Sequence, residues 1–207
     1  MTSEAANTAA ALATAYLLGS IPFGFLLPLL TRGVDVRTLG SGNPGATNVY
    51  RVVGPMSGLA VGALDGLKGW VAVLAAGPAA AVTGDWVRVA AAVLAVGGHT
   101  WPAWTGFRGG KGVITTAGAF VRLAPWPLTG AVAVFAFVFW TTRMVAAGSI
   151  AAALVLPVLA FSLPDPAMTG IVRGATVIVA LLVVVRHRSN LRRIIGGTEY
   201  RFRGRRR

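Results

Sequence analysis

The sequence predicts an all-α integral membrane protein, and three observations lead to that fold class. Hydrophobic residues make up 55% of the 207 residues and the mean hydropathy is +0.70, which is too apolar for an ordinary soluble domain. The 19 Lys and Arg far exceed the six Asp and Glu, and cytoplasmic loops of membrane proteins collect such cations. The apolar residues also fall into segments of helical length. Soluble nucleic-acid-binding proteins rarely carry this much aliphatic surface, so no nucleic-acid partner is expected.

Seven apolar segments are candidates for transmembrane helices, each of which needs roughly 20 residues unless it is distorted. In chain order they cover residues 9–30, 55–76, 86–98, 113–123, 128–140, 145–163 and 171–185. Gly19 and Pro22 interrupt the first segment, and one of the short fourth and fifth segments is expected to tilt, kink or span incompletely. Residues 1–8 contain no Lys or Arg, so the first segment is interpreted as a retained span rather than a secretory signal.

Three polar islands, rich in glycine and cations, separate the apolar segments. They are residues 40–51, 98–112 and 186–193. The chain is predicted to be one polytopic membrane domain, 1–207, with motif loops at about 32–51, 98–112 and 186–199. Two segments separate the first two islands and four separate the last two, so all three islands are expected at one membrane face.

The distribution of cations orients the chain. The face that holds the islands and the C-terminal tail is expected to carry 15 of the Lys and Arg, whereas the opposite face carries only Arg88, Arg122 and Arg173. This asymmetry predicts about seven spans with the N-terminus outside and the C-terminus in the cytoplasm. The tail, residues 196–207, is expected to be a solvated arm near anionic lipid headgroups.

The second apolar segment carries both a glycine ridge and two charges. Its glycines recur every four residues, which predicts close packing against another backbone; they are Gly54, Gly58, Gly62 and Gly66. Asp65 and Lys68 lie three residues apart on one helical face. Burying either charge alone is costly, so they are expected to pair with each other or to point toward the functional site.

The first island has the composition of a phosphate-binding loop. Its start matches the dinucleotide pattern G-x-G-x-x-G, but no predicted strand precedes it and no crossover unit follows, so a nucleotide-binding fold is not expected. Glycine backbone lets N–H groups approach a phosphate, and an arginine can bind its oxygens in a bidentate fork. The residues expected to bind are Ser41, Asn43, Gly45, Thr47, Asn48 and Arg51.

The second island contains Gly109-Gly110-Lys111-Gly112, which only superficially matches a P-loop. Thr105 stands where that motif requires its first glycine, and Gly112 stands where it requires Ser or Thr. Glycine backbone and a lysine just before a predicted helix nevertheless form a phosphate nest. His99, at the end of the third segment, is either a hydrogen-bonding or proton-transferring residue or a structural histidine at the interface.

The third island places His187 and Asn190 on one helical face and Arg188 and Arg192 on another. His187 is the best candidate for a side-chain general base. The chain has two His, no Cys and six scattered acidic residues, so neither a metal site nor a cofactor is expected.

Together the three islands resemble the bacterial acyl-phosphate:glycerol-3-phosphate acyltransferase (PlsY) family over nearly the whole chain. The residues that carry the likeness are 41–48 with Arg51, then Gly98, His99, Pro102, Phe107 and 109–113, and then 187–190 with Glu199. Residues 19–24 and 65–69 are also similar to the family. Ile114 and Ser189 depart from it, because smaller residues and Glu respectively are common there.

The resemblance implies acyl transfer from acyl phosphate to the 1-hydroxyl of sn-glycerol 3-phosphate, giving lysophosphatidic acid and inorganic phosphate in the first step of phospholipid synthesis. It implies a multi-pass enzyme of the bacterial inner membrane, with its active site on the cytoplasmic face; a monomer is expected. The implied catalytic residues are Ser41, Arg51, Lys111, His187 and Asn190. Further phosphate contacts are expected from His99, Gly109, Gly110, Gly112 and Arg188. Asp65, Lys68 and Glu199 are expected to support the site, Glu199 by pairing with an arginine.

The residues fit this chemistry independently. Neither histidine is followed five residues later by Asp, as in the usual glycerolipid acyltransferase motif, and a covalent acyl-enzyme has little support without cysteine or a nucleophile elbow. Acyl phosphate is already activated, so positioning and charge stabilisation can supply most of the rate, and either His187 or the donor phosphate can accept the proton.

Two other functions share some of these features. A transporter for a phosphorylated metabolite should show internal repeats, of which the sequence has no sign. A metal-dependent phosphatidyl transferase needs clustered carboxylates, which this sequence does not supply.

Overall fold

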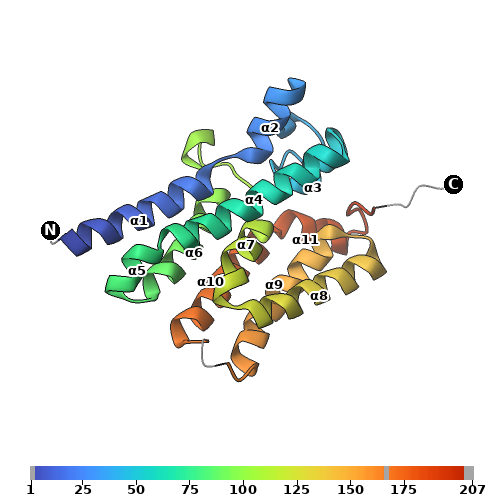
Figure 1. The fold of residues 1–207 in the computed structure, drawn as a ribbon. Helices are drawn as coiled ribbons and strands as arrows, with labels where there is room; N and C mark the ends of the chain where they lie inside the picture. Colours follow the sequence, from blue (N-terminus) through green and yellow to red (C-terminus); the bar gives the residue numbers. More distant parts are fainter. Residues whose placement is uncertain (1–2, 166–167, 203–207) are drawn as a thin grey trace. The chain divides into compact units, whose positions relative to one another are not determined.

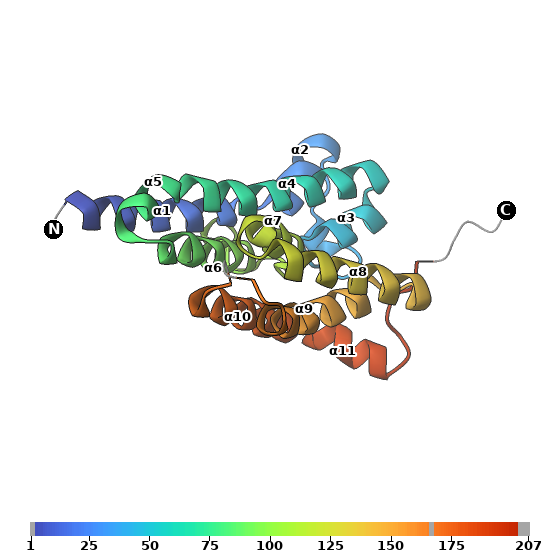
Figure 2. The same ribbon diagram turned by 60° about the horizontal axis from the view of Figure 1, so that its bottom comes forward.

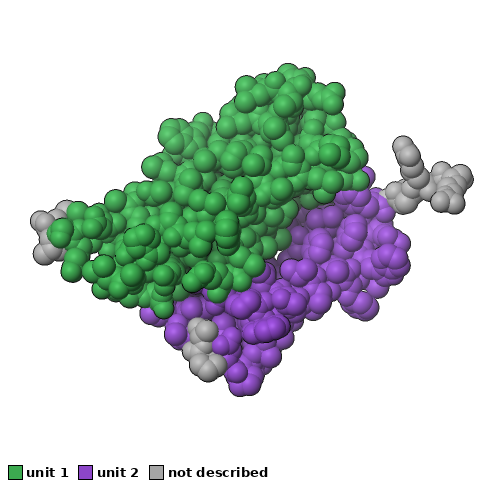
Figure 3. Space-filling model, viewed as in Figure 1, with its two compact units in different colours: residues 1–122 green, residues 123–207 purple. Residues whose placement is uncertain are grey.

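The computed structural model describes residues 3–165 and 168–202, and its regular secondary structure there is helical (Figure 1). Contacts within the predicted single domain group into two compact units, residues 1–122 and 123–207 (Figure 3). The α-helices of the first unit are α1 (Ser3–Ser20), α2 (Phe23–Arg32), α3 (Ala46–Val52), α4 (Pro55–Ala75), α5 (Gly77–Thr83), α6 (Trp86–Thr100) and α7 (Val113–Leu123). It also contains two 3₁₀ turns, η1 (Val36–Thr38) and η2 (Ala103–Thr105). The second unit contains α8 (Pro125–Thr142), α9 (Val145–Ser162), α10 (Gly170–Arg186) and α11 (Arg188–Ile195).

Each of the seven predicted apolar segments coincides with a helix, and the first is broken where Gly19 and Pro22 predicted. Helices α1 and α2 meet at an angle of 44° on either side of Ile21 and Pro22. Proline lacks a backbone N–H and clashes with the preceding helical turn, which explains the break. The break leaves the Ile21 carbonyl oxygen outside the regular pattern of helix α1, where a side chain from another helix can reach it.

The first unit has a core of small residues. Helices α1, α4 and α6 run side by side (Figures 1 and 2), and Ala15, Ala72 and Ala95 are buried where they meet. A Cβ atom at Gly19 would collide with the Ala95 carbonyl, so the α1 and α6 backbones are in direct contact. Small residues allow such approach in membrane helices, where dispersion replaces much of the hydrophobic driving force.

The predicted glycine ridge of α4 does pack against other backbones, but not at every position. A Cβ atom at Gly58 would lie 2.6 Å from the Tyr50 Cα atom. A Cβ atom at Gly118 on α7 would collide with the Gly66 carbonyl, so the α4 and α7 backbones are in direct contact there. Gly62 has only ordinary contacts. Gly54 is the N-cap residue of α4, with φ of 131° and open space around it, so the packing prediction is wrong there.

In the second unit, α8 and α9 form a helical hairpin joined by Arg143 and Met144. Arg143 has φ of 60° and ends α8 in the left-handed region. Helix α10 packs against α9, and α11 follows α10 after a bend of 58° at His187. The bend ends the last apolar helix at the start of the third island.

Length and composition identify three helical spans in the described chain: Pro55–Thr83, Pro125–Thr142 and Val145–Ser162. The bent pairs α1–α2 and α10–α11 raise the number to five if each pair is one span. Helices α6 and α7 are only 15 and 11 residues long. The chain is therefore an all-helical integral membrane protein with three to five candidate spans, while the count of about seven stays a prediction.

Candidate active site

The first island is a tight turn followed by a short helix. Gly40 and Gly42 have φ of 60° and 69°, a region that residues with a Cβ atom rarely adopt. Helix α3 begins directly after Gly45 and carries Thr47, Asn48 and Arg51. The expectation that the whole island is a loop is therefore wrong for its second half. The helix was not predicted because it is only seven residues long and because the glycine- and asparagine-rich residues before it are typical of a turn.

Asn48 holds the turn in place. Its side-chain oxygen accepts a hydrogen bond from the Ser41 backbone N–H at 2.9 Å, and its side-chain nitrogen donates to the Val36 and Leu39 carbonyls at 3.1 and 3.0 Å. The side chain is 2% exposed. Ser41 is exposed, and Asn43, Thr47 and Arg51 are half-buried. Asn48 thus serves as an internal brace on which the orientation of Ser41 depends.

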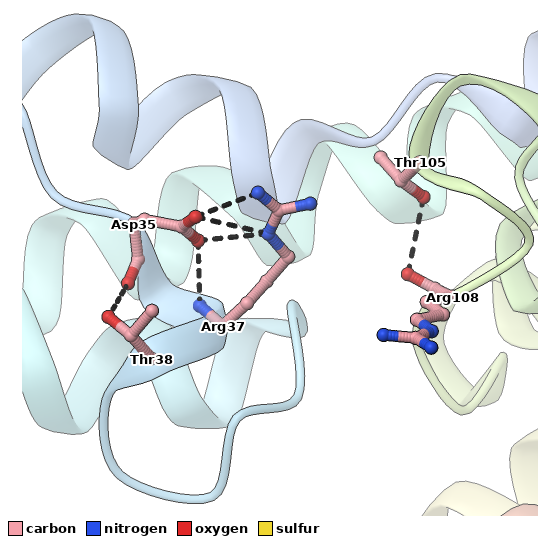
Figure 4. Close-up of polar contacts among 5 residues, drawn as sticks. All are labelled: Asp35, Arg37, Thr38, Thr105 and Arg108. Atoms are coloured by element: carbon pink, nitrogen blue, oxygen red, sulfur yellow. Dashed lines mark hydrogen bonds and ion pairs between the residues drawn. The ribbon is translucent and has the colours of Figure 1, made fainter.

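The segment that leads into the first island is fixed by an ion pair between Asp35 and Arg37 (Figure 4). Arg37 Nη2 lies 2.7 Å from Asp35 Oδ2, and the Arg37 backbone N–H donates to Asp35 Oδ1 at 2.9 Å. These hydrogen bonds hold the pKa of the Asp35 carboxyl below its ordinary value. The Arg37 guanidinium also lies 4.1 Å from the centre of the Phe25 ring, which ties the segment to α2.

The second island folds back onto the end of α6. The Gly110 backbone N–H donates to the His99 carbonyl and the Gly109 N–H donates to the Thr100 carbonyl, both at 3.1 Å. Gly109 and Gly110 are buried, whereas Lys111, which follows them, is half-buried. Gly112 has φ of 80° and immediately precedes α7. The glycines therefore bring backbone and a lysine together at one tight turn.

Arg108 lies before this turn and is exposed. Its carbonyl accepts a hydrogen bond from the Thr105 hydroxyl at 3.2 Å (Figure 4), which closes the loop that carries it.

Beneath the turn lies a buried network of three charged or titratable side chains. Lys68 Nζ is 2.8 Å from Asp65 Oδ1, and His99 Nδ1 is 3.5 Å from the same oxygen. Lys68 also donates a 2.8 Å hydrogen bond to the Ile21 carbonyl at the break between α1 and α2. Asp65, Lys68 and His99 are 3%, 5% and 9% exposed. The predicted pairing of Asp65 with Lys68 is confirmed, and the pair is joined to the second island through His99.

A small cavity borders this network, with a volume of about 10 Å³, close to the space that one water molecule needs. Its lining comes from the α1–α2 break, the first island, α4 and the second island: Ser20, Ile21, Pro22, Phe23, Gly24, Pro44, Asp65, Lys68, His99, Pro102, Gly109 and Gly110. The structure thus brings parts of the first and second islands together around one small pocket.

The third island forms a separate buried cluster in the second unit. His187 is 3% exposed, and its Nδ1 lies 2.8 Å from the Val183 carbonyl oxygen. Because a carbonyl can only accept, the proton of this contact belongs to Nδ1. Nε2 is then the ring nitrogen with the lone pair, as a general base requires.

Asn190 and Arg193 both bind Glu199. Asn190 Nδ2 donates to Glu199 Oε1 at 2.9 Å, and Arg193 Nε donates to Oε2 at 2.8 Å. The predicted pairing of Glu199 with an arginine is confirmed. As expected, Arg188 and Arg192 lie on the other face and are exposed.

The tail is docked rather than solvated over residues 196–202, because it contains the buried Glu199 and packs onto α8. The Phe202 backbone N–H donates to the Arg143 carbonyl at 2.8 Å, and the Phe202 and Phe139 rings meet edge to face at 5.8 Å. The composition of the tail, dominated by arginine, concealed these two anchors. The remainder of the predicted arm, residues 203–207, lies outside the described residues.

Within residues 3–165 and 168–202, no group of three or more His, Cys, Asp or Glu side chains is placed to hold a metal ion. The sequence predicted the Asp65–Lys68 pair and singled out His99, but not that the three side chains form one network. The available signal was the presence of two opposite charges in an apolar helix, which must find polar partners.

These features define the class of the protein: an all-helical integral membrane protein whose polar islands combine glycine backbone, cations and buried hydrogen-bonded side chains. A family model described as glycerol-3-phosphate acyltransferase matches residues 9–197. The glycerol-3-phosphate acyltransferase of Syntrophotalea carbinolica is 43% identical over 93% of this chain and 96% of its own length. That of Geobacter sulfurreducens is 42% identical over 92% and 95%.

Two solved structures are similar over 95% of the chain. One is PlsY (YgiH), an integral membrane glycerol 3-phosphate acyltransferase, in its glycerol 3-phosphate form; it has a TM-score of 0.86, 36% identity and 96% of its own chain covered. The other is the lysophosphatidic acid form of PlsY, with a TM-score of 0.83, 35% identity and 95% covered. The chain described here belongs to the glycerol-3-phosphate acyltransferase family and is a membrane acyltransferase of phospholipid synthesis.

Proposed function

We propose that this glycerol-3-phosphate acyltransferase uses acyl phosphate as its donor. The 1-hydroxyl oxygen of sn-glycerol 3-phosphate attacks the acyl carbonyl carbon, and the bond from that carbon to the phosphate oxygen breaks. The products are lysophosphatidic acid and inorganic phosphate. The observation that carries the proposal is the pairing, in one unit, of two glycine-rich islands that each carry a cation at or next to their last residue, Arg51 and Lys111. Two anionic substrates need such cations close to flexible backbone.

We assign roles to the first two islands as follows. Arg51 and Lys111 neutralise phosphate oxygens, while backbone at Gly45, Gly109, Gly110 and Gly112 allows close approach. Ser41, Asn43 and Thr47 orient substrate oxygens. The three backbone contacts of Asn48 favour a bracing role for its side chain over direct phosphate binding. No metal or cofactor enters this reaction, because the donor already carries a good leaving group.

In the third island, His187 and Asn190 position glycerol 3-phosphate and its reacting hydroxyl. Arg188 adds positive charge nearby, and Glu199 orients Asn190. The hydroxyl proton leaves to a phosphate oxygen of the donor, which becomes part of the released phosphate. The alternative acceptor is Nε2 of His187, which the contact between Nδ1 and Val183 equips as a base. The electrostatic part of the acceleration comes from the cations, whose geometry is set before the reaction begins.

The proposed site faces the cytoplasm at a bacterial inner membrane, and the N-terminus lies outside. The enzyme acts as a monomer. The support for this orientation is the excess of Lys and Arg around the islands and along the C-terminal tail.

A comparison of donors tests the proposal. Purified enzyme in detergent receives glycerol 3-phosphate with either acyl phosphate or acyl-CoA of the same chain length, and lysophosphatidic acid is measured. We expect turnover with acyl phosphate and at most a trace with acyl-CoA, because the islands lack the usual glycerolipid acyltransferase motif of a histidine followed five residues later by Asp. Equal turnover with both donors would contradict the proposed donor. The Lys111→Ala variant, prepared in parallel, reports activity that does not come from this site.

A further inference from the structure

The imidazole of His99 lies directly beneath the Gly110 backbone. A Cβ atom built on Gly110 would have three nearest neighbours, all of them His99 ring atoms, and would overlap the ring at Nε2. The two residues are also joined through their backbones, since the Gly110 N–H donates to the His99 carbonyl. The His99 ring on α6 therefore limits how closely the turn that carries Lys111 can approach that helix.

The His99 ring is itself held from the side. Its Nδ1 faces Asp65 Oδ1 at 3.5 Å, and Lys68 Nζ binds the same oxygen at 2.8 Å. Lys68 then reaches the Ile21 carbonyl at the α1–α2 break, and its ammonium lies 5.6 Å from the centre of the Phe23 ring. Opposite charges held this closely in a buried setting fix each other's geometry, whatever their net contribution to stability.

We infer that Asp65, Lys68 and His99 form a positioning network for the phosphate-binding turn, with His99 as the support on which Gly110 rests. This rests on the proposed function of the turn. It also gives His99 a different task from the one expected from sequence: the histidine does not contact phosphate but sets where Lys111 and the backbone N–H groups meet it. Misplacement by about 1 Å at a site of this kind is enough to lose as much as 10²-fold in rate.

A double-mutant cycle between His99 and Gly110 tests the inference, because the three atoms nearest to the side chain of an alanine at 110 all belong to the His99 ring. We expect Gly110→Ala to reduce kcat/KM strongly in the parent enzyme, and to reduce it much less when combined with His99→Asn. Asparagine removes the ring edge below Gly110 and keeps an amide near the position of Nδ1, where it can still donate to Asp65. Coupling between contacting residues is what such a cycle measures.

Gly109→Ala is the matched control. A Cβ atom at Gly109 would meet the His99 carbonyl and Pro102 rather than the imidazole, so His99→Asn should not relieve that variant. Gly97→Ala, at a position in α6 with nothing within 4 Å of the added atom, controls for any glycine substitution in this helix and should leave kinetics unchanged.

Inhibition by inorganic phosphate, the reaction product, separates positioning from stability. In His99→Ala and in Asp65→Asn we expect the Ki for phosphate to rise by about tenfold to about 10²-fold at temperatures well below the measured Tm. The KM of the substrate whose phosphate sits on the turn should rise in parallel, while the KM of the other substrate changes little. A purely structural role would lower Tm and leave both constants of the folded enzyme unaltered.

Two results would overturn the inference: Gly110→Ala equally harmful with and without the His99 ring, or an unchanged Ki for phosphate in folded His99 and Asp65 variants. Parent enzyme that makes no lysophosphatidic acid in the same assay would instead refute the proposed function. If His99→Ala does not give monodisperse protein, the cycle with His99→Asn and the Asp65→Asn variant decide the question.

Discussion

Among single residues, Arg51 and Lys111 offer different kinds of cation to the substrates. Arg51 lies in the last turn of α3 and presents a planar fork that can hold two phosphate oxygens at once. Lys111 follows two buried glycines and presents a compact point charge at a turn where backbone N–H groups are near. Lysine is therefore an informative replacement for Arg51, because it keeps the positive charge and removes the planar fork.

We expect Arg51→Ala and Lys111→Ala each to lower kcat/KM by about 10²-fold or more, because truncating one partner of a buried charge pair leaves the anion uncompensated. Arg51→Lys should also be impaired, since an ammonium cannot reproduce the bidentate fork. Steady-state assays on monodisperse variants check this. Near-normal turnover in all three variants would refute the phosphate-site assignment.

His187 can be tested as a base by comparing it with Asn190, which lies on the same face but does not titrate. If the donor phosphate takes the proton, His187→Ala should raise the KM for glycerol 3-phosphate and keep the shape of the pH–rate profile. If His187 is the base, kcat should fall by about 10²–10⁴-fold and the acidic limb should vanish. We expect the first pattern. Loss of the limb in His187→Ala but not in Asn190→Ala would overturn it.

At the scale of helices and turns, seven apolar segments predicted seven helices because hydrophobicity persists over helical lengths. Helices α3 and α11 were not predicted as separate elements, since one follows a glycine-rich turn and the other is dominated by arginine. Their geometry depends on side-chain contacts with residues outside the helix, Asn48 with Val36 at a separation of 12 residues and Asn190 with Glu199 at a separation of nine. Likewise, composition predicted charged residues inside α4, but not that Lys68 would bind a carbonyl 47 residues away.

The turn before α3 should depend on Asn48 for its conformation. Asn48→Ala removes the side-chain partner of the Ser41 N–H and of the Val36 and Leu39 carbonyls, although both carbonyls keep a backbone donor. Each lost hydrogen bond costs about 0.5–1.5 kcal/mol. We expect a lower Tm in detergent together with loss of activity, since Ser41 is no longer oriented. Thr38→Ala removes a hydroxyl that bonds the Asp35 carbonyl at an exposed site and serves as the control. An Asn48→Ala enzyme as stable and active as Thr38→Ala would contradict the bracing role.

For the whole molecule, orientation in the membrane follows from charge and can be measured directly because the chain has no cysteine. Asp85→Cys, in an exposed connection on the predicted outer side, should react with a membrane-impermeant maleimide in intact cells. Thr198→Cys, exposed on the predicted cytoplasmic side, should react only after permeabilisation. Loss of the Asp85 pair with Arg88 should matter little, because exposed ion pairs contribute little. The reverse labelling pattern would contradict the proposed topology.

The central claim is direct transfer from acyl phosphate to the hydroxyl of glycerol 3-phosphate, and a pre-steady-state measurement of phosphate release tests it most directly. Enzyme at a concentration comparable to that of acyl phosphate is mixed rapidly, with and without glycerol 3-phosphate. With the acceptor present, we expect one phosphate and one lysophosphatidic acid per acyl phosphate consumed; without it, we expect no burst of phosphate, because the hydroxyl itself expels the leaving group. A burst equal to the enzyme concentration without acceptor would reveal a covalent acyl-enzyme and contradict the account.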